Sequence, residues 1–136
     1  MAFVLDASIA GCWAFDDEDH PVAAKALDLM RTDQAIVPHL WWLEVRNLLI
    51  MNERRGRGSE AVTADFLRSL SHLPIAVDGA AEDTRLPDLA RRHRLTVYDA
   101  AYLELAQRLD APLATLDEPL ARAAKAERVV LIGASG

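Results

Sequence analysis

The chain has 136 residues, of which 51% are hydrophobic and 26% charged, and its formal net charge is -6. This length closes one hydrophobic core, so we expect a single domain over residues 1–136, and the apolar content excludes a disordered chain. The single cysteine, Cys12, cannot form an intramolecular disulfide or a zinc cage alone. A disulfide-stapled scaffold and a zinc finger are therefore excluded, and a reducing cytoplasm is expected.

No segment predicts a membrane protein. The apolar start of the chain lacks a preceding Lys or Arg and is interrupted by Asp6, unlike a signal peptide. No other stretch runs long enough without charges to cross a bilayer. The acidic net charge argues against sequence-blind binding to nucleic acid, but it leaves open an enzyme that acts on nucleic acid through local basic patches.

Short apolar runs alternate with longer helical patterns along the chain. The predicted strands are residues 2–5, 35–37, 74–77, 112–116 and 129–132. The predicted helices are residues 8–15, 22–32, 39–55, 59–70, 79–93, 98–109 and 119–126. Because the strands are continuously apolar, both of their faces should be covered by helices. We therefore expect an α/β protein, a three-layer α/β/α sandwich around a parallel sheet.

The first candidate site residue, Asp6, follows the first strand, with Ser8 two residues later. An Asx turn or a helix cap would explain this acid on its own.

Glu44 is harder to explain, because it lies inside the predicted helix 39–55 on a largely apolar face. Leu40, Trp41 and Leu48 share that face, and Asn47 adds a polar atom one turn on. A carboxylate on that face must pair with a basic side chain, extend to the solvent at the edge of the face, or hold a cation. Arg55 is a possible partner, so both interpretations stay open.

The next landmark predicts the tip of a helical hairpin. Arg54 and Arg55 end one helix, Gly56 stops it, and Ser59 caps the next helix after Arg57.

Asp99 and Asp117 complete a set of acids near element ends. Thr96 and Asp99 have the spacing of a capping box, and Asp117 precedes a helix that it can cap. However, Asp6 and Asp117 both follow strands, and ligands of open parallel sheets bind outside the carboxyl ends of strands.

A cluster of these acids would favour a bound metal ion. Two carboxylates 4 Å apart repel by about 4 kcal/mol at an effective dielectric of 20, and a divalent cation would relieve this repulsion. Oxygen ligands alone favour Mg²⁺ or Mn²⁺ over Zn²⁺.

Four segments, taken in order, resemble a known family. They are residues 4–8, 42–49, 95–106 and 111–117. Together they resemble the PIN-domain ribonucleases, and among these the VapC-type toxins of bacterial toxin–antitoxin modules. The similarity covers nearly the whole chain.

The resemblance implies a site, a fold and a function. The metal-binding acids of the family correspond to Asp6, Glu44, Asp99 and Asp117, and its supporting polar residues to Ser8 and Asn47. The implied sheet has five parallel strands in the order 3-2-1-4-5. The implied activity is Mg²⁺- or Mn²⁺-dependent cleavage of RNA by a homodimer that a cognate antitoxin neutralises.

Other functions fit the sequence less well. A phosphoacceptor receiver domain needs a second acid after Asp6 and a Lys near the last strand, and a haloacid-dehalogenase phosphatase needs an Asp in place of Ser8. The interpretation as a non-catalytic module, whose acidic pocket binds only a partner's arginine, stays open.

Two basic clusters are candidates to hold an RNA backbone: Arg54, Arg55 and Arg57, and Arg91, Arg92 and Arg94. Plain solvated surface would explain both equally well.

Overall fold

The computed structural model describes residues 1–15 and 20–133. In these residues four parallel strands form one sheet in the order β3-β2-β1-β4. The strands are β1 (Ala2–Leu5), β2 (Gln34–Val37), β3 (Ile75–Val77) and β4 (Leu113–Ala114). The helices are α1 (Ala7–Ala14), α2 (Pro21–Leu29), α3 (Leu40–Arg54), α4 (Glu60–Ser71), α5 (Arg85–His93), α6 (Val97–Leu109) and α7 (Glu118–Ala126).

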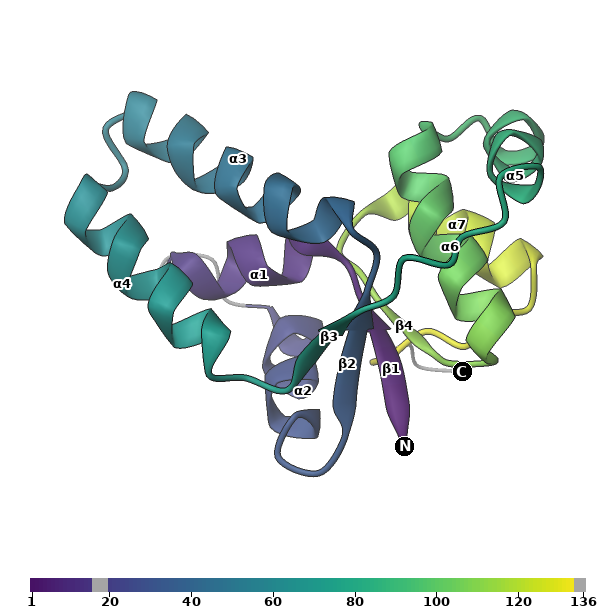
Figure 1. Ribbon diagram of the computed structural model, residues 1–136, viewed down its shortest axis with the longest axis horizontal. Helices are drawn as coiled ribbons and strands as arrows, with labels where there is room; N and C mark the ends of the chain where they lie inside the picture. Colours follow the sequence, from purple (N-terminus) through teal and green to yellow (C-terminus); the bar gives the residue numbers. More distant parts are fainter. Residues whose placement is uncertain (16–19, 134–136) are drawn as a thin grey trace.

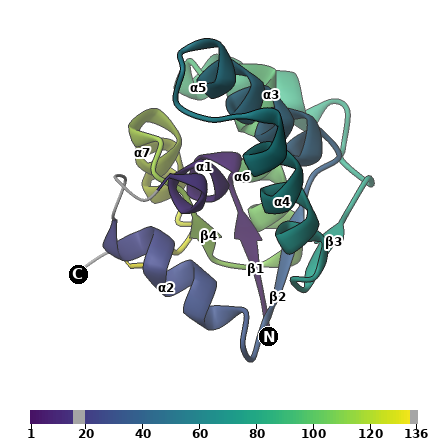
Figure 2. The same ribbon diagram turned by 90° about the vertical axis from the view of Figure 1, so that its left-hand side faces the viewer.

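Helices cover both faces of the sheet, as predicted. In Figure 1, α1 to α4 lie to the left of β1, with β3 crossing in front of α2, and α5 to α7 lie to the right of β1. Figure 2 views the molecule from the left and shows α1, α2 and α4 in front of the strands. Consecutive residues of β1 are buried, from Phe3 to Leu5, although their side chains point to opposite faces. The continuous apolar runs of the sequence therefore reflect a sheet covered on both sides.

The predicted fifth strand, 129–132, is wrong as a strand. This segment makes one parallel bridge, between Leu131 and Leu113, at the β4 edge where the fifth strand was expected. Two left-handed residues, Arg128 at φ 63° and Gly133 at φ 79°, enclose it and limit its extended length. The predicted order of the other four strands is confirmed.

The predicted helix 79–93 begins later than expected, at Arg85. Asp78 accepts a hydrogen bond from the Ala80 backbone N–H at 2.9 Å, a local turn that competes with helix formation. A Cβ on Gly79 would lie 2.1 Å from Nε2 of His39, so a side chain packs against the backbone there. The other predicted helices begin and end within about three residues of the observed ones, as is usual for helix ends.

The hairpin tip between α3 and α4 is confirmed. Gly56 adopts φ 74°, and the Ser59 hydroxyl accepts a hydrogen bond from the Val62 backbone N–H at 3.2 Å. No helix among the described residues is long and apolar enough to cross a membrane.

Candidate active site

Asp6 lies between β1 and α1, and only 5% of it is exposed. Its side chain makes no capping hydrogen bond to α1 within the described residues. Instead, Oδ2 accepts hydrogen bonds from the Ser8 hydroxyl at 2.6 Å and from the Thr115 hydroxyl at 2.7 Å. Both hydroxyls donate to the same oxygen, and within the described residues Oδ1 accepts no hydrogen bond. The interpretation of Asp6 as a side-chain cap of α1 is therefore wrong.

The same two hydroxyls connect the ends of β1 and β4. Ser8 Oγ accepts a hydrogen bond from the Leu116 backbone N–H at 3.0 Å, and Thr115 Oγ1 accepts one from the Asp117 backbone N–H at 3.0 Å. The predicted proximity of the first and fourth strand ends is confirmed by the parallel pairing of β1 with β4. Sequence analysis missed Thr115, although a hydroxyl residue two positions before a strand-end acid was a usable signal.

Asp117 serves as a helix cap and also faces the site. Its Oδ2 accepts a hydrogen bond from the Leu120 backbone N–H at 2.9 Å, at the start of α7. The capping interpretation is therefore confirmed, but it does not exclude a second role, because Asp117 also lines the pocket described below.

Glu44 projects from α3 and is half-buried. Its Oε1 accepts a hydrogen bond from the hydroxyl of Tyr102, on α6. Within the described residues Arg55 is not its partner, so the ion-pair interpretation is wrong. Asn47 lies one turn further along α3 and is exposed.

Asp99 lies in the first turn of α6 and is half-buried. Its backbone N–H donates to the Thr96 hydroxyl at 3.0 Å, which is one half of the predicted capping box. A carboxylate in this turn is favoured by the helix dipole.

These residues meet in one small pocket of about 230 Å³. It is lined by Asp6, Ala7, Ser8, Glu44, Asn47, Leu48, Asp99 and Asp117. The four predicted acids and both supporting residues therefore line the same cavity, although they come from four separate parts of the chain. In residues 1–15 and 20–133 no group of three or more His, Cys, Asp or Glu side chains has the arrangement of a completed metal site.

The pocket disfavours negative charge. Burial is the main cause that raises the pKa of the Asp6, Glu44 and Asp99 carboxyl groups above their ordinary values. Neighbouring carboxylates raise each pKa further: Asp117 acts on both Asp6 and Asp99, and Asp6 acts on Glu44. Hydrogen bonds from Ser8, Thr115, Tyr102 and Thr96 partly oppose these shifts. No Lys or Arg is among the causes of these shifts, so the pocket is an acidic cluster that a cation would stabilise.

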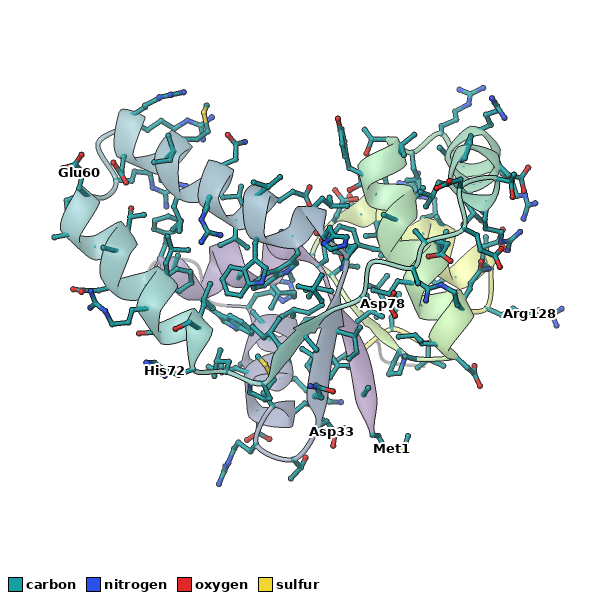
Figure 3. All side chains as sticks on the ribbon, viewed as in Figure 1. Met1, Asp33, Glu60, His72, Asp78 and Arg128 are labelled. Atoms are coloured by element: carbon teal, nitrogen blue, oxygen red, sulfur yellow. The ribbon has the colours of Figure 1, made fainter. Side chains whose placement is uncertain are left out.

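The basic clusters lie outside the pocket. Arg54, Arg55 and Arg57 are exposed at the hairpin tip, with Arg57 5.1 Å above the ring of Phe15. About ten residues of α3 separate Glu44 from this tip, roughly 15 Å along the helix. Glu60, labelled in Figure 3, marks the same end of the molecule.

The second cluster is exposed around the end of α5, and its members differ in their pairing. Arg92 donates to Asp88 at 2.9 Å and to Glu127 at 2.8 Å, so its charge is largely balanced. Arg94 lies three residues before the start of α6 and adopts φ 55°.

A larger cavity of about 560 Å³ lies at the opposite end of α6. Some of its charged side chains are paired with one another: Arg108 Nε lies 2.7 Å from Glu104, and Arg85 lies 4.0 Å from Glu127. This cavity is therefore lined by both arginines and acids, whereas the charged residues of the acidic pocket are all acids.

Comparison with known proteins agrees with the geometry. The sequence profile of the PIN domain matches residues 3–126. Ribonuclease VapC3 of Pyrobaculum aerophilum is 32% identical over 124 residues, which cover 89% of this chain and 93% of the relative. The chain therefore belongs to the PIN-domain family and is of its VapC type.

Solved structures support the same fold. The crystal structure of PAE2754 from Pyrobaculum aerophilum matches with a TM-score of 0.72 at 22% identity, over 90% of this chain and 84% of that one. The structure of Mycobacterium tuberculosis VapC20, described as a toxin that cleaves the sarcin-ricin loop, matches with a TM-score of 0.60 at 12% identity. That match covers 89% of this chain and 94% of the toxin.

Proposed function

We propose that this protein is a Mg²⁺- or Mn²⁺-dependent ribonuclease that acts as the toxin of a toxin–antitoxin pair. The observation that carries the proposal is the convergence of Asp6, Glu44, Asp99 and Asp117 on one pocket, in a chain of the PIN-domain family. The related ribonuclease VapC3 supports RNA as the substrate.

The residues of the pocket fit a hard divalent cation. All of its polar side chains offer oxygen atoms as ligands, and burial together with neighbouring carboxylates raises the pKa of the Asp6 and Glu44 carboxyl groups, so a cation would stabilise their ionised forms. Asp6, Glu44, Asp99 and Asp117 would hold the ion. When bound, the ion supplies Lewis acidity, which activates water and offsets charge at the scissile phosphate.

The chain itself contributes orientation. Ser8 and Thr115 fix Asp6 through one oxygen, and the Leu120 N–H fixes Asp117 through one oxygen. Each acid thus keeps its second oxygen for a ligand. Asn47, exposed at the rim, is placed to donate to a phosphate oxygen or to a base.

The direct test is cleavage of a labelled RNA by the purified protein in Mg²⁺, in Mn²⁺ and in excess EDTA. We expect cleavage with either ion and none in EDTA. A preparation of the Asp6→Ala variant, purified in the same way, controls for contaminating nucleases. Full cleavage in EDTA would contradict the metal dependence.

The same experiment separates the enzyme from the non-catalytic alternative. An acidic pocket that only binds a partner's arginine would show no cleavage with either ion, yet would still bind that partner.

The VapC resemblance also implies partners. A cognate antitoxin would block the pocket with an arginine, because a guanidinium bonds two carboxylate oxygens at once. Exposed apolar side chains such as Leu43 (72%) on α3 and Tyr98 (63%) on α6 offer surface for a homodimer. A toxin that cleaves cellular RNA would work in the cytoplasm.

The antitoxin prediction can be tested with the product of a neighbouring reading frame. We expect tight binding that weakens strongly when every arginine of that partner is replaced by alanine. Unchanged affinity would contradict an arginine block.

A further inference from the structure

The ring of Tyr102 is completely buried, but its hydroxyl reaches the wall of the acidic pocket. Tyr102 lies one turn after Asp99 on α6, and its exposure is 0%. From this position the hydroxyl donates a hydrogen bond to Oε1 of Glu44, 58 residues away in the sequence. Within the described residues no other group donates to this carboxylate. The bond therefore connects α6 to α3 at the site itself.

The chemistry of the two groups sets the direction of this hydrogen bond. The phenol hydroxyl of Tyr102 carries a proton to donate, whereas the oxygens of an ionised carboxylate only accept, so Tyr102 is the donor and Glu44 the acceptor. Within the described residues Oε2 of Glu44 accepts no hydrogen bond.

A neutral donor suits a carboxylate that must receive a cation. An arginine or lysine in the same place would neutralise Glu44 and compete with the ion, whereas a hydroxyl orients the carboxylate and leaves its charge. Asp6 has the same kind of support, from two neutral hydroxyls. Glutamate also loses much rotamer freedom when it is fixed, so orienting it before binding lowers the entropy cost of binding.

We propose that Tyr102 is a positioning residue, which holds the Glu44 carboxylate in one orientation for a divalent cation. The inference rests on the proposed function, since it assigns the cation to this pocket. It adds Tyr102 to the site residues that were predicted from the sequence.

The test is calorimetric titration of Mn²⁺ into the purified full chain without RNA. The variants are Tyr102→Phe, Glu44→Ala and the double variant. Tyr98→Phe is the matched control, because it removes a hydroxyl from the same helix at a side chain that is 63% exposed. Phe fills the buried volume of the tyrosine ring, so the core is preserved.

We expect Tyr102→Phe to weaken Mn²⁺ binding by roughly tenfold, as is typical when the support of a metal ligand is removed. Tyr98→Phe should bind as the wild type does. In the Glu44→Ala background, Tyr102→Phe should cause no further loss, because the hydroxyl then has no carboxylate to orient. In RNA cleavage at a fixed low Mn²⁺ concentration, kcat should fall while KM for RNA stays unchanged.

Two outcomes would overturn the positioning role while the ribonuclease proposal survives. One is wild-type Mn²⁺ affinity in Tyr102→Phe, and the other is an equal loss with and without Glu44, which would indicate a general structural effect. If the wild-type chain bound no Mn²⁺ and cleaved no RNA, the proposed function itself would fail, and the positioning role with it.

Discussion

At the scale of single residues, the four acids are not equivalent. Replacing Asp6, Glu44 or Asp99 with Ala should lower RNA cleavage by at least about 100-fold, because each removes a cation ligand. Asp117→Ala should lower cleavage less, since one of its oxygens already caps α7. Cleavage rates and circular dichroism of each variant check both statements. Wild-type rates in the first three variants would contradict the site.

The same acids make the metal-free protein less stable. Burial, and then Asp117, raise the pKa of Asp99, so its ionised form is disfavoured in the folded state. A carboxyl group with a raised folded pKa costs stability at neutral pH, and this cost disappears as the pH falls through that pKa. In EDTA at pH 7, Asp99→Asn should raise Tm by roughly 2–4 °C.

The control for this gain is Asp28→Asn. Asp28 is exposed and lies 3.3 Å from Arg31, so the same change there should give no increase in Tm. An equal or lower Tm for Asp99→Asn than for the wild type in EDTA would contradict a stability cost of the ionised Asp99.

At the scale of elements, Thr115 joins the loops that follow β1 and β4. Its hydroxyl donates to Asp6 and accepts from the Asp117 backbone N–H. Thr115→Val should therefore lower the free energy of unfolding by about 1–3 kcal/mol, because a buried carboxylate loses a donor and a backbone donor loses its acceptor. Urea unfolding measures this, with Thr32→Val as an exposed control. A loss equal to that of the control would contradict the bridging role.

Glu127, which follows α7, joins α5, α6 and α7. It accepts hydrogen bonds from His93 at 2.6 Å, Arg92 at 2.8 Å and Gln107 at 2.9 Å. The bond to His93 is the largest cause that lowers the pKa of Glu127, to about 2. A lowered carboxyl pKa stabilises the fold above the unfolded value near 4.5, and this stability is lost as the pH falls towards 2.

Between pH 5 and pH 2 the wild type should therefore lose about 1–2 kcal/mol more of its unfolding free energy than Glu127→Gln does. Urea unfolding across this range measures the difference. Parallel pH curves for the two proteins would show that Glu127 does not contribute in this way.

Sequence patterns predicted the helices and four of the strands because each has a local signal. The hairpin tip depends on Gly56 and Ser59, and β1 on an uninterrupted apolar run. The fifth strand had the same apolar signal, but the left-handed residues Arg128 and Gly133 enclose it. The left-handed conformation at Arg128 has no local signature, since glycine and not arginine usually adopts it.

At the scale of the whole molecule, the four acids and the supporting residue Ser8 were predicted, whereas the contacts of Thr115 and Tyr102 with the acids were not. Asp6 and Asp117 follow strands that the parallel topology brings together, so their positions could be inferred from the sequence and from the family resemblance. Thr115 and Tyr102 act across 109 and 58 residues of sequence. The place of Thr115 two residues before Asp117 was a local signal, but the contact of Tyr102 with Glu44 depends on how α6 packs against α3, which no periodicity in the chain encodes.

The distribution of charge over the protein surface determines where RNA can bind. Because the protein has a net charge of -6, an RNA backbone needs local basic surface to approach the acidic pocket. The exposed candidates are the hairpin-tip cluster, Arg54, Arg55 and Arg57, and the cluster near the start of α6, Arg91, Arg92 and Arg94. Within the second cluster, Arg92 is already paired with Asp88 and Glu127, so Arg91 and Arg94 should contribute more.

Binding of single-stranded RNA to the Asp6→Ala protein, measured against salt concentration, tests both clusters. Each lost phosphate contact should flatten the plot of log affinity against log salt by about 0.7. Arg91→Gln/Arg94→Gln should therefore reduce the slope by roughly 1.4 for every RNA sequence, and the triple change at the hairpin tip by up to about 2. Arg31→Gln, an exposed arginine on the α2 side paired with Asp28, should leave the slope unchanged. Unchanged slopes in both cluster variants would exclude both clusters from the RNA path.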